Sequence, residues 1–377
     1  MGKRSMKAAS AHGEKDTRNA SEMHTVREFE ERAKKILSRM AYDYYRSGAD
    51  EQRSLKANRR AFRDFELWYR VLVDVANVNL RTSVLGAPIA MPVIIAPTAY
   101  HKLAHAEGEC ATAKAASDAG TIFVLSTLAT TSLEDVARAA NGVKWFQLYV
   151  HKDRGLTRAL IERAQQAGYQ AIVLTVDAPL LGRRLADVRN GFALPDGMVM
   201  ANLVDAAAPP DATGSALANY VAARHDPSLT WHDLAWLKSI TSLPIVLKGI
   251  VREDDAVRAV QHGCDAIVVS NHGARQLDGS PATLRALPGV VDAVRGRCEV
   301  LMDGGVRWGT DVLKALALGA RAVLIGRPVL WGLAVDGQHG VARVLEIFRN
   351  ELTTALTLAG CPSVTAIPSD LVRKTSG

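Results

Sequence analysis

The sequence predicts an α/β protein built as a parallel (β/α)8 barrel, with a helical segment before the barrel and a long loop after its fourth strand. Three observations support this prediction. Beyond residue 90, eight short and largely apolar runs recur along the chain. A stretch rich in Ala, Leu and Arg, with helical character, follows each run. Nearly every run also ends in a hydrogen-bonding or ionisable residue, and in such barrels the carboxyl ends of the strands form the rim that carries the active site.

The chain begins with a polar segment and then a predicted helix. Residues 1–23 are polar and rich in Ala, Ser and Lys, so we expect a disordered basic tail there. Thr25 and Glu28 form a capping box, and apolar residues from Phe29 to Tyr44 recur at helical spacing. Gly48 is expected to end this helix. Because Tyr44 lies in line with its apolar face, a packing role is the alternative to a functional one.

The eight apolar runs are expected to form the barrel strands, because apolar runs without alternation are typical of strands buried on both faces. We place this (β/α)8, or TIM, barrel domain at residues 24–365 and a C-terminal tail at 366–377. The interval between Asp177 and Pro244 is the one irregular spacing, and its two prolines at 209 and 210 predict an extended loop that covers the substrate. The runs are PVIIAP (92–97), TIFVLS (121–126), KWFQLY (144–149), AIVLTVD (171–177), PIVLK (244–248), DAIVVS (265–270), EVLMDG (299–304) and RAVLIG (321–326).

The composition argues against several classes of protein. The net charge of +7 is diffuse and aromatic residues make up only 6%, without interleaving with basic clusters, so no nucleic-acid partner is expected. No apolar run reaches the roughly 18 to 20 residues of a membrane span, and no apolar export signal begins the chain. The four cysteines form no C-x-x-C pair, which argues against a zinc site or a disulfide framework and fits the reducing cytoplasm.

The stretch VVSNHGARQLD (268–278) combines a base and an anion anchor at the end of a predicted strand. His272 exchanges a proton near neutral pH, whereas Arg275 keeps its charge and presents a fork that matches a carboxylate. The alternative is a surface turn made by Gly273, in which both side chains are solvated.

The loops after the seventh and eighth strands predict a phosphate site. Gly304 and Gly305 free backbone N–H groups to face an anion, and Arg307 adds positive charge. Arg327 precedes a proline at the start of a helix whose first turn can also donate hydrogen bonds. The alternative is two tight turns that use glycine only for geometry.

A flat heterocycle would fit the neighbouring strand ends. Gln147, Thr175 and Lys248 offer an amide, a hydroxyl and an ammonium group to its polar edge, and Lys248 could stabilise negative charge that develops on it. FMN combines such a ring with one phosphate. No G-x-G-x-x-G follows a strand to bind a dinucleotide, and no G-x-x-x-x-G-K-[ST] is present for a nucleoside triphosphate. A structural ion pair is the alternative role for Lys248.

His101 and His105 have the i, i+4 spacing of a metal pair. The glutamate of the H-E-x-x-H motif is missing, however, and neither histidine falls at a strand end. No metal site is therefore predicted.

Nine strings of the sequence, in order, resemble the FMN-dependent L-2-hydroxy acid oxidases and dehydrogenases, the family of glycolate oxidase and lactate oxidase. The likeness covers roughly residues 24–365 and runs through YDYYRSGADE, IIAPTA, LAHAEGE, FQLYVHKDR, LTVDAPLLGRR, LPIVLKG, SNHGARQLD, DGGVRWGTDVLKALALGA and IGRP. The resemblance implies an FMN-dependent (S)-2-hydroxy acid oxidase, a cytoplasmic homo-oligomer (a tetramer or octamer) that forms a 2-oxo acid and, with O2 as acceptor, H2O2. The alternative is a dehydrogenase that uses a quinone or another acceptor. A flavin-binding barrel without turnover is a third possibility, against which the catalytic residues argue.

The resemblance also implies roles for individual residues. His272 would be the catalytic base, and Asp177 would hold and stabilise its imidazolium. Tyr149 would hydrogen-bond the substrate hydroxyl, and Arg275 would bind its carboxylate. The side chains that would join Arg275 around the carboxylate are Tyr44 and Arg184. The residues that would hold FMN are Pro97, Thr98, Ala99, Ser126, Gln147, Thr175, Lys248, Ser270, Asp303, Gly304, Gly305, Val306, Arg307, Gly326 and Arg327.

The chain departs from the glycolate oxidase pattern at the substrate pocket. Leu128 stands where the plant-type enzyme has a tryptophan, Tyr100 replaces a methionine and Leu180 replaces an arginine. Leu128 and Leu180 are expected to line a wider apolar pocket, and Tyr100 to bind substrate by filling part of it. We therefore expect longer aliphatic or aromatic 2-hydroxy acids to be better substrates than glycolate. Ala99, where the mandelate dehydrogenase motif has a glycine, favours oxygen as the acceptor.

Overall fold

Eight parallel strands close into a barrel in the computed structural model, which describes residues 19–203 and 215–375. Hydrogen-bonded neighbours follow chain order around the barrel, and the last strand pairs with the first. Each strand overlaps one of the eight apolar runs, so the predicted barrel is confirmed. The strands are β4 (Val93–Ile95), β5 (Phe123–Leu125), β6 (Lys144–Leu148), β7 (Ile172–Thr175), β8 (Ile245–Ile250), β9 (Ala266–Val269), β10 (Glu299–Asp303) and β11 (Ala322–Ile325).

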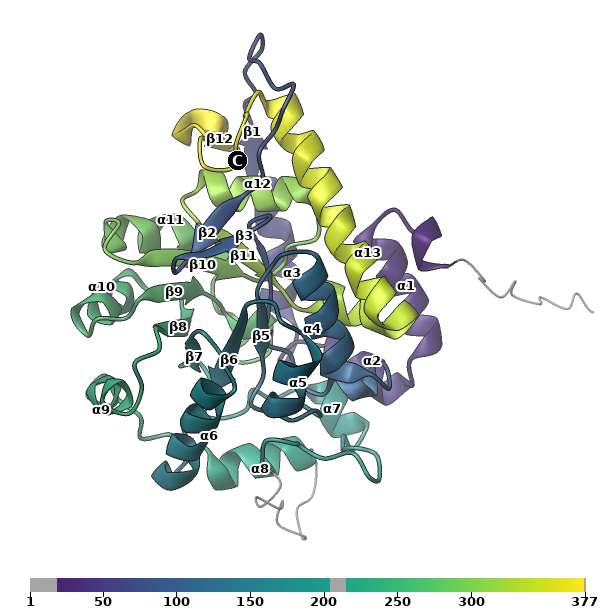
Figure 1. The fold of residues 1–377 in the computed structure, drawn as a ribbon, viewed down its shortest axis with the longest axis vertical. Coiled ribbons are helices and arrows are strands. Elements are labelled where there is room, and N and C mark those ends of the chain that lie inside the picture. Colours follow the sequence, from purple (N-terminus) through teal and green to yellow (C-terminus); the bar gives the residue numbers. More distant parts are fainter. Residues whose placement is uncertain (1–18, 204–214, 376–377) are drawn as a thin grey trace, which may run out of the picture.

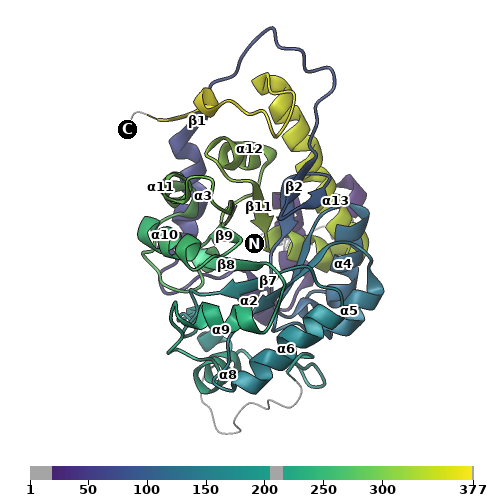
Figure 2. The same ribbon diagram turned by 60° about the vertical axis from the view of Figure 1, so that its left-hand side comes forward.

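Helices surround this barrel on its outside (Figure 1). Figure 2 shows the strands in the centre with helices ringed around them. This is the arrangement expected when each strand is apolar on both faces and needs a helix to cover its outer face. The covering helices are α4 (Gly108–Asp118), α5 (Leu133–Ala139), α6 (Arg154–Gln166), α9 (Asp233–Ser239), α10 (Glu253–Gln261), α11 (Thr283–Val294), α12 (Gly309–Ala317) and α13 (Arg327–Ala359).

Two small sheets lie outside the barrel. β2 (Thr82–Val84) and β3 (Ala87–Ile89) form an antiparallel hairpin. β1 (Phe65–Leu67) pairs antiparallel with β12 (Val372–Lys374), which ties the C-terminal segment to residues that precede the barrel.

The buried apolar residues form two clusters, one on each side of the barrel sheet. The smaller cluster holds at least one residue from every barrel strand together with Val84 and Ile89 of the β2–β3 hairpin. The larger cluster lies between the strands and the helices. Successive strand residues alternate between the clusters, as Val173 and Leu174 do. Alternation of side chains between two buried faces explains why the strand sequences are apolar throughout.

The N-terminal helical segment is two helices before the barrel rather than one. α1 (Val26–Ile36) starts with the predicted Thr25–Glu28 capping box. The prediction of one continuous helix to Tyr44 was wrong, because Leu37 is extended (ψ 147°) and Ser38 caps a second helix, α2 (Arg39–Arg46). A third helix, α3 (Arg53–Arg60), follows and leads toward the rim of the barrel.

Both predicted tails contain ordered residues. Residues 1–18 lie outside the described residues, but residues 19–23 include a turn of 3-10 helix (Ala20–Glu22). Met23 is fully buried, and its backbone carbonyl accepts a hydrogen bond from Arg343 Nε of α13 at 3.1 Å. At the other end, Leu371 is buried and β12 belongs to the predicted C-terminal tail. Ordered structure therefore extends beyond residues 24–365 at both ends.

The long segment after β7 contains two short helices over the rim of the barrel. These are α7 (Leu185–Arg189) and α8 (Ala216–Arg224). Prolines 209 and 210 of the predicted extended loop lie outside the described residues. In the described ranges, no helix combines the length and the apolar character that crossing a membrane requires.

Candidate active site

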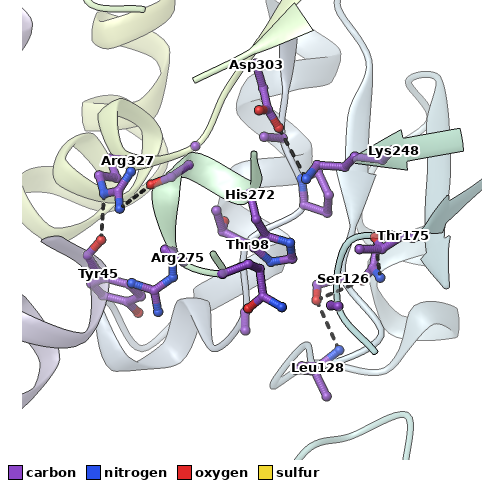
Figure 3. A pocket seen from close by; sticks show the side chains of 18 of the residues that line it. Tyr45, Thr98, Ser126, Leu128, Thr175, Lys248, His272, Arg275, Asp303 and Arg327 are labelled. Carbon is purple, nitrogen blue, oxygen red and sulfur yellow. Dashed lines mark hydrogen bonds and ion pairs between the residues drawn. The ribbon is translucent and has the colours of Figure 1, made fainter. Parts of the chain in front are cut away.

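A pocket opens at the carboxyl ends of the barrel strands, and residues from all eight strand ends line it (Figure 3). Most of the predicted site residues are in this lining. They are Tyr44, Pro97, Thr98, Ala99, Ser126, Leu128, Gln147, Tyr149, Thr175, Arg184, Lys248, His272, Arg275, Asp303, Gly304, Gly305, Val306, Arg307, Gly326 and Arg327. Asp177 and Ser270 are not part of the lining, but each forms a hydrogen bond with a residue that is.

His272 lies in a strained turn after β9 and is paired with Asp177 after β7. Its φ of 59° is in the left-handed region, which is uncommon for a residue with a side chain and concentrates at functional sites. Its backbone N–H donates to Ser270 Oγ at 3.0 Å. Nδ1 of His272 and Oδ1 of Asp177 are 2.8 Å apart in a hydrogen bond. The imidazole is therefore held from behind by a carboxylate, with the ring facing the pocket.

The protonation of this pair follows from burial and mutual contact. Burial lowers the pKa of His272 from its ordinary value, although Asp177 acts in the opposite direction. Burial alone would raise the pKa of Asp177, but its contacts with His272 and the charge of Lys248 lower it. At neutral pH the imidazole is thus neutral and can accept a proton beside an ionised carboxylate.

Two arginines approach each other on the side of the pocket nearest α2. Arg275 Nη1 donates to the backbone carbonyl of Ser47 at 2.9 Å, and its guanidinium lies 4.8 Å from the centre of the Tyr44 ring. Arg184 is buried, and its Nε donates to the Arg275 carbonyl at 3.4 Å. Burial and the proximity of Arg275 lower the pKa of Arg184 to about 10. In the described ranges neither guanidinium group forms an ion pair with a carboxylate, although Asp187 lies near enough to influence both. Two such neighbouring cations favour an anionic ligand between them.

A polar network connects the ends of three adjacent strands. Ser126 Oγ donates to Gln147 Oε1 at 3.3 Å, and Gln147 Nε2 donates to Thr175 Oγ1 at 3.0 Å. On the far side, Lys248 Nζ lies 3.2 Å from Asp303 Oδ2 and 3.1 Å from Ser270 Oγ. Burial would lower the pKa of Lys248, but Asp303 and Asp177 raise it.

Lys248 therefore forms an ion pair with Asp303, which was the predicted alternative to a contact with the heterocycle. Both side chains line the pocket (Figure 3). Asp303 Oδ1 is buried without a hydrogen-bond partner among the described residues. Since an unpaired buried carboxylate oxygen is costly, this atom indicates that a donor from a ligand belongs at the site.

The loops after β10 and β11 present glycines and two arginines. Gly304 and Gly305 have φ of 100° and 86°, and a Cβ on Gly305 would lie 2.4 Å from the Asn58 carbonyl oxygen. Glycine is thus required by the close approach of α3 as well as by the turn. Arg327 Nε donates to the Tyr45 carbonyl at 2.9 Å, while Nε of Arg307 is buried without a partner in the described part of the chain.

Two predicted pocket residues do not line the pocket. Leu180 is 61% exposed and faces solvent, because Gln276 Nε2 binds its carbonyl and holds the turn on the surface. Tyr100 is fully buried, with its ring 5.5 Å from Tyr44 and 6.1 Å from Phe192. It therefore packs behind Tyr44 and does not fill the substrate space.

The two histidines with metal-pair spacing diverge. The His101 ring is buried, with Nε2 2.6 Å from Thr98 Oγ1 and Nδ1 2.9 Å from Thr112 Oγ1. His105 is partly exposed and lies near Glu107. No group of three or more His, Cys, Asp or Glu side chains in the described ranges is placed to hold a metal ion.

Several residues of the site were missed at the sequence level. Asn58 of α3 and Asn271 exchange two side-chain hydrogen bonds of 2.8 and 2.9 Å, which fix the start of the His272 turn. Gln276 Nε2 binds the Asp177 carbonyl at 3.1 Å. His225, after α8, lines the pocket beside Tyr149. Asn271 and Gln276 carried a signal in the sequence, because both belong to the SNHGARQLD string.

Known proteins share both this sequence and this structure. The sequence model described as FMN-dependent dehydrogenase matches residues 33–374. The chain belongs to that family. It is 56% identical to an L-lactate oxidase from Nostoc sp. over 92% of this chain and 96% of the relative. Identity to glycolate oxidase from Spinacia oleracea is 52%, over 92% and 94%.

Solved structures agree with this family membership. A crystal structure of mandelate oxidase with (S)-4-hydroxymandelic acid matches with a TM-score of 0.90 and 44% identity, covering 94% of this chain and 99% of that one. The family and the FMN cofactor predicted from the sequence are confirmed.

The residues that line the pocket fit FMN, the cofactor of this family. Four arginines line it, Arg184, Arg275, Arg307 and Arg327, and none of them forms an ion pair with a carboxylate in residues 19–203 and 215–375. The unpaired Asp303 Oδ1 lies near Lys248, and the unpaired Arg307 Nε lies beside the two-glycine turn. A group with a polar ring edge and a phosphate would satisfy both atoms.

Proposed function

We propose that this protein oxidises an (S)-2-hydroxy acid to the 2-oxo acid with FMN, and that O2 accepts the electrons and is released as H2O2. The observation that carries this proposal is the convergence of a neutral, carboxylate-held histidine and two guanidinium groups without ion pairs on one pocket. The names of the similar oxidases support the hydroxy acid substrate and the oxygen acceptor. When bound, FMN supplies the two-electron acceptor of the reaction.

The proposed roles begin with binding and orientation of the substrate. Arg275 and Arg184 bind the carboxylate, which places the α-carbon at a fixed position in the pocket. Tyr44 packs against Arg275 and is itself stacked on Phe192 at 4.3 Å, so the anchor is rigid. Tyr149, whose pKa is raised by burial, keeps its proton and donates a hydrogen bond to the substrate hydroxyl.

Proton transfer is assigned to the histidine–aspartate pair. His272 Nε2 accepts a proton from the substrate, and the imidazolium that results is stabilised by Asp177 on Nδ1. Gln147, Thr175 and Lys248 would hold the ring of FMN, and residues Asp303–Arg307 with Gly326 and Arg327 would hold its ribityl chain and phosphate. Lys248 remains positively charged because Asp303 raises its pKa, so it offers a fixed positive charge to the ring.

The expected result of anaerobic mixing tests the reaction directly. Adding an (S)-2-hydroxy acid to the purified yellow protein without oxygen should bleach the flavin absorbance, and admitting air should restore the colour and yield peroxide. Denaturation of the protein should release FMN. The absence of bleaching with any acid of a panel would contradict the proposed function. Bleaching without recovery in air would favour the dehydrogenase alternative with another acceptor.

The pH dependence of kcat/KM is expected to follow His272. Burial holds its pKa below the ordinary value of 6.5. The neutral form accepts protons, so kcat/KM should be constant above that pKa and fall about tenfold per pH unit below it. Asp177→Asn removes the carboxylate that raises this pKa, so the acid limb should move to lower pH. An acid limb centred above 6.5 in the parent protein would contradict the role of His272.

Substrate size is expected to depend on Leu128. Its side chain is buried and lines the pocket, and its backbone N–H donates to Ser126 Oγ at 3.1 Å, which fixes the position of the chain. Each extra buried methylene of a substrate contributes about 0.8 kcal/mol. The ratio of kcat/KM for 2-hydroxyoctanoate to that for glycolate should exceed one in the parent and fall in Leu128→Trp. An unchanged ratio in the variant would show that residue 128 does not set the size of the pocket.

We also propose that the protein is a cytoplasmic homotetramer. Its four cysteines are free thiols, which supports a reducing compartment. The tetramer rests on the family resemblance, and light scattering of the purified protein in solution tests it.

A further inference from the structure

His225 is a buried polar side chain whose ring forms no well-aligned hydrogen bond with the described residues, although the Ala178 backbone lies near it. It follows α8 and is 3% exposed. Its backbone N–H donates to the Val221 carbonyl at 2.9 Å, so the backbone donor is satisfied. Neither Nδ1 nor Nε2 has a partner among the described residues. An unsatisfied buried group costs about 1–3 kcal/mol, so a ring that lacks a well-aligned partner in the described residues is suited to bind a group from a ligand.

Aromatic neighbours hold the His225 ring in place without satisfying it. The ring stacks on Tyr149, with 4.6 Å between centroids and 27° between planes. It meets His151 edge-on at 5.4 Å and Tyr220 edge-on at 6.1 Å. Nε2 of His151 is already hydrogen-bonded to the Tyr220 hydroxyl at 3.2 Å. The position of the His225 ring is thus fixed by packing, which is what a binding group requires.

The ring is uncharged at neutral pH. Burial, and after it the neighbouring His151, lowers the pKa of His225 to about 3, although the Ala178 backbone acts in the opposite direction. A neutral imidazole has one N–H donor and one acceptor nitrogen. Such a ring suits an uncharged hydroxyl, which also both donates and accepts, better than it suits a second carboxylate.

His225 lies where the active-site pocket meets a second cavity. It lines the same pocket as Tyr149, Arg184 and Arg275. It also lines a cavity of about 290 Å³ whose walls include Leu174 and Leu247 of β7 and β8 and Trp231 and Trp236 next to and within α9. The two spaces share Tyr149, Thr175, Ala178 and His225. A substrate carboxylate on the arginines would therefore direct its side chain toward a wall that carries His225.

We propose that His225 is a specificity-determining residue that hydrogen-bonds an uncharged hydroxyl on the side chain of the 2-hydroxy acid. The preferred substrates are then 2-hydroxy acids that carry a further hydroxyl beyond the α-carbon. This inference rests on the proposed function, because it concerns the side chain of the same substrate.

Matched substrate pairs that differ by one hydroxyl test the inference. Glycerate against lactate places the extra hydroxyl close to the α-carbon, and 3-(4-hydroxyphenyl)lactate against 3-phenyllactate places it farther away. In the parent protein, kcat/KM for the hydroxylated member of at least one pair should be roughly 5- to 10-fold higher, as expected of one net hydrogen bond. In His225→Phe, which keeps an aromatic ring on Tyr149, that preference should disappear. His225→Gln returns a donor and an acceptor and should restore part of it.

Tyr220→Phe is the matched control. It removes a hydroxyl from a ring that touches His225 but does not line the active-site pocket, so the substrate preference should stay as in the parent. A parent without hydroxyl preference in either pair, a result that needs no variant to fold, would overturn the inference. So would a preference that survives in His225→Phe. Turnover of lactate with no hydroxyl preference would refute this inference alone, whereas no bleaching with any 2-hydroxy acid would refute the proposed function.

Discussion

Replacing His272 by alanine is expected to lower kcat roughly 10²- to 10⁴-fold while the protein keeps its FMN and its fold. The loss corresponds to about 2.7–5.4 kcal/mol of transition-state stabilisation. The reason is that the neutral imidazole of His272 is the proposed proton acceptor. A carboxylate holds it in position, with 2.8 Å between His272 Nδ1 and Asp177 Oδ1. Single-turnover bleaching of the flavin without oxygen measures the step in which the proton is lost.

His339→Ala is a suitable control for this experiment. His339 lies on α13 with an exposed side chain, and its removal should leave both the bleaching rate and the flavin content unchanged. Asp177→Asn should lower the bleaching rate less than His272→Ala, because the imidazole remains but its cation loses the neighbouring negative charge. A His272→Ala protein with near-parental bleaching would show that another group takes the proton.

The barrel could be predicted from the sequence because its strands are buried on both faces. Val173 faces one apolar cluster and Leu174 the other, so most strand positions before the carboxyl ends select an apolar residue and the run stands out. The polar residues that end each run then had to share one rim, since all the strands are parallel. Lys248 and Asp303 meet there although 55 residues separate them in the chain.

The sequence pattern did not predict three features of the structure: the break between α1 and α2, the orientation of Tyr100 and the position of His225. The break between α1 and α2 was missed because the apolar spacing continues through Leu37, and only the Ser38 cap marks it. Tyr100 was expected in the pocket because it stands where the glycolate oxidase pattern has a methionine, yet its backbone is left-handed (φ 62°) and its side chain packs behind Tyr44. His225 gave no sequence signal, because its distance from Tyr149 is set by how the segment after β7 folds back.

Arginines that form no ion pair with a described carboxylate lie at both ends of the pocket. Arg184 and Arg275 lie together at the end nearest α2, and Arg307 follows the glycine turn at the other end. Arg327 donates to the same Ser47 carbonyl as Arg275 and so lies beside that arginine. Burial and neighbouring positive charge lower the pKa of Arg327 well below its ordinary value. Keeping four such cations without ion pairs costs stability in the free protein. The phosphate of FMN and the carboxylate of the substrate would offset that cost when they bind. The affinity of the protein for both ligands would therefore depend on these four arginines.

Arg275→Lys is expected to raise KM and lower kcat/KM about 10²-fold or more, even though the charge is conserved. A guanidinium can donate two parallel hydrogen bonds to a carboxylate, whereas an ammonium group acts as a single point of contact. Losing one charge-assisted hydrogen bond costs about 1.5–3 kcal/mol, which is roughly a 10- to 150-fold effect.

The geometry around Arg275 adds to this loss. Its Nη1 also donates to the Ser47 carbonyl, and its guanidinium lies over the Tyr44 ring, so a lysine would release both the anchor and its neighbour. Arg183→Lys is a matched control, because Arg183 has an exposed side chain and is paired with Asp50 at 2.7 Å. Its kinetics should stay close to those of the parent. If Arg275→Lys bound the 2-oxo acid product and turned over substrate as the parent does, Arg184 alone would be the carboxylate anchor, and the proposed orientation of the substrate would be wrong.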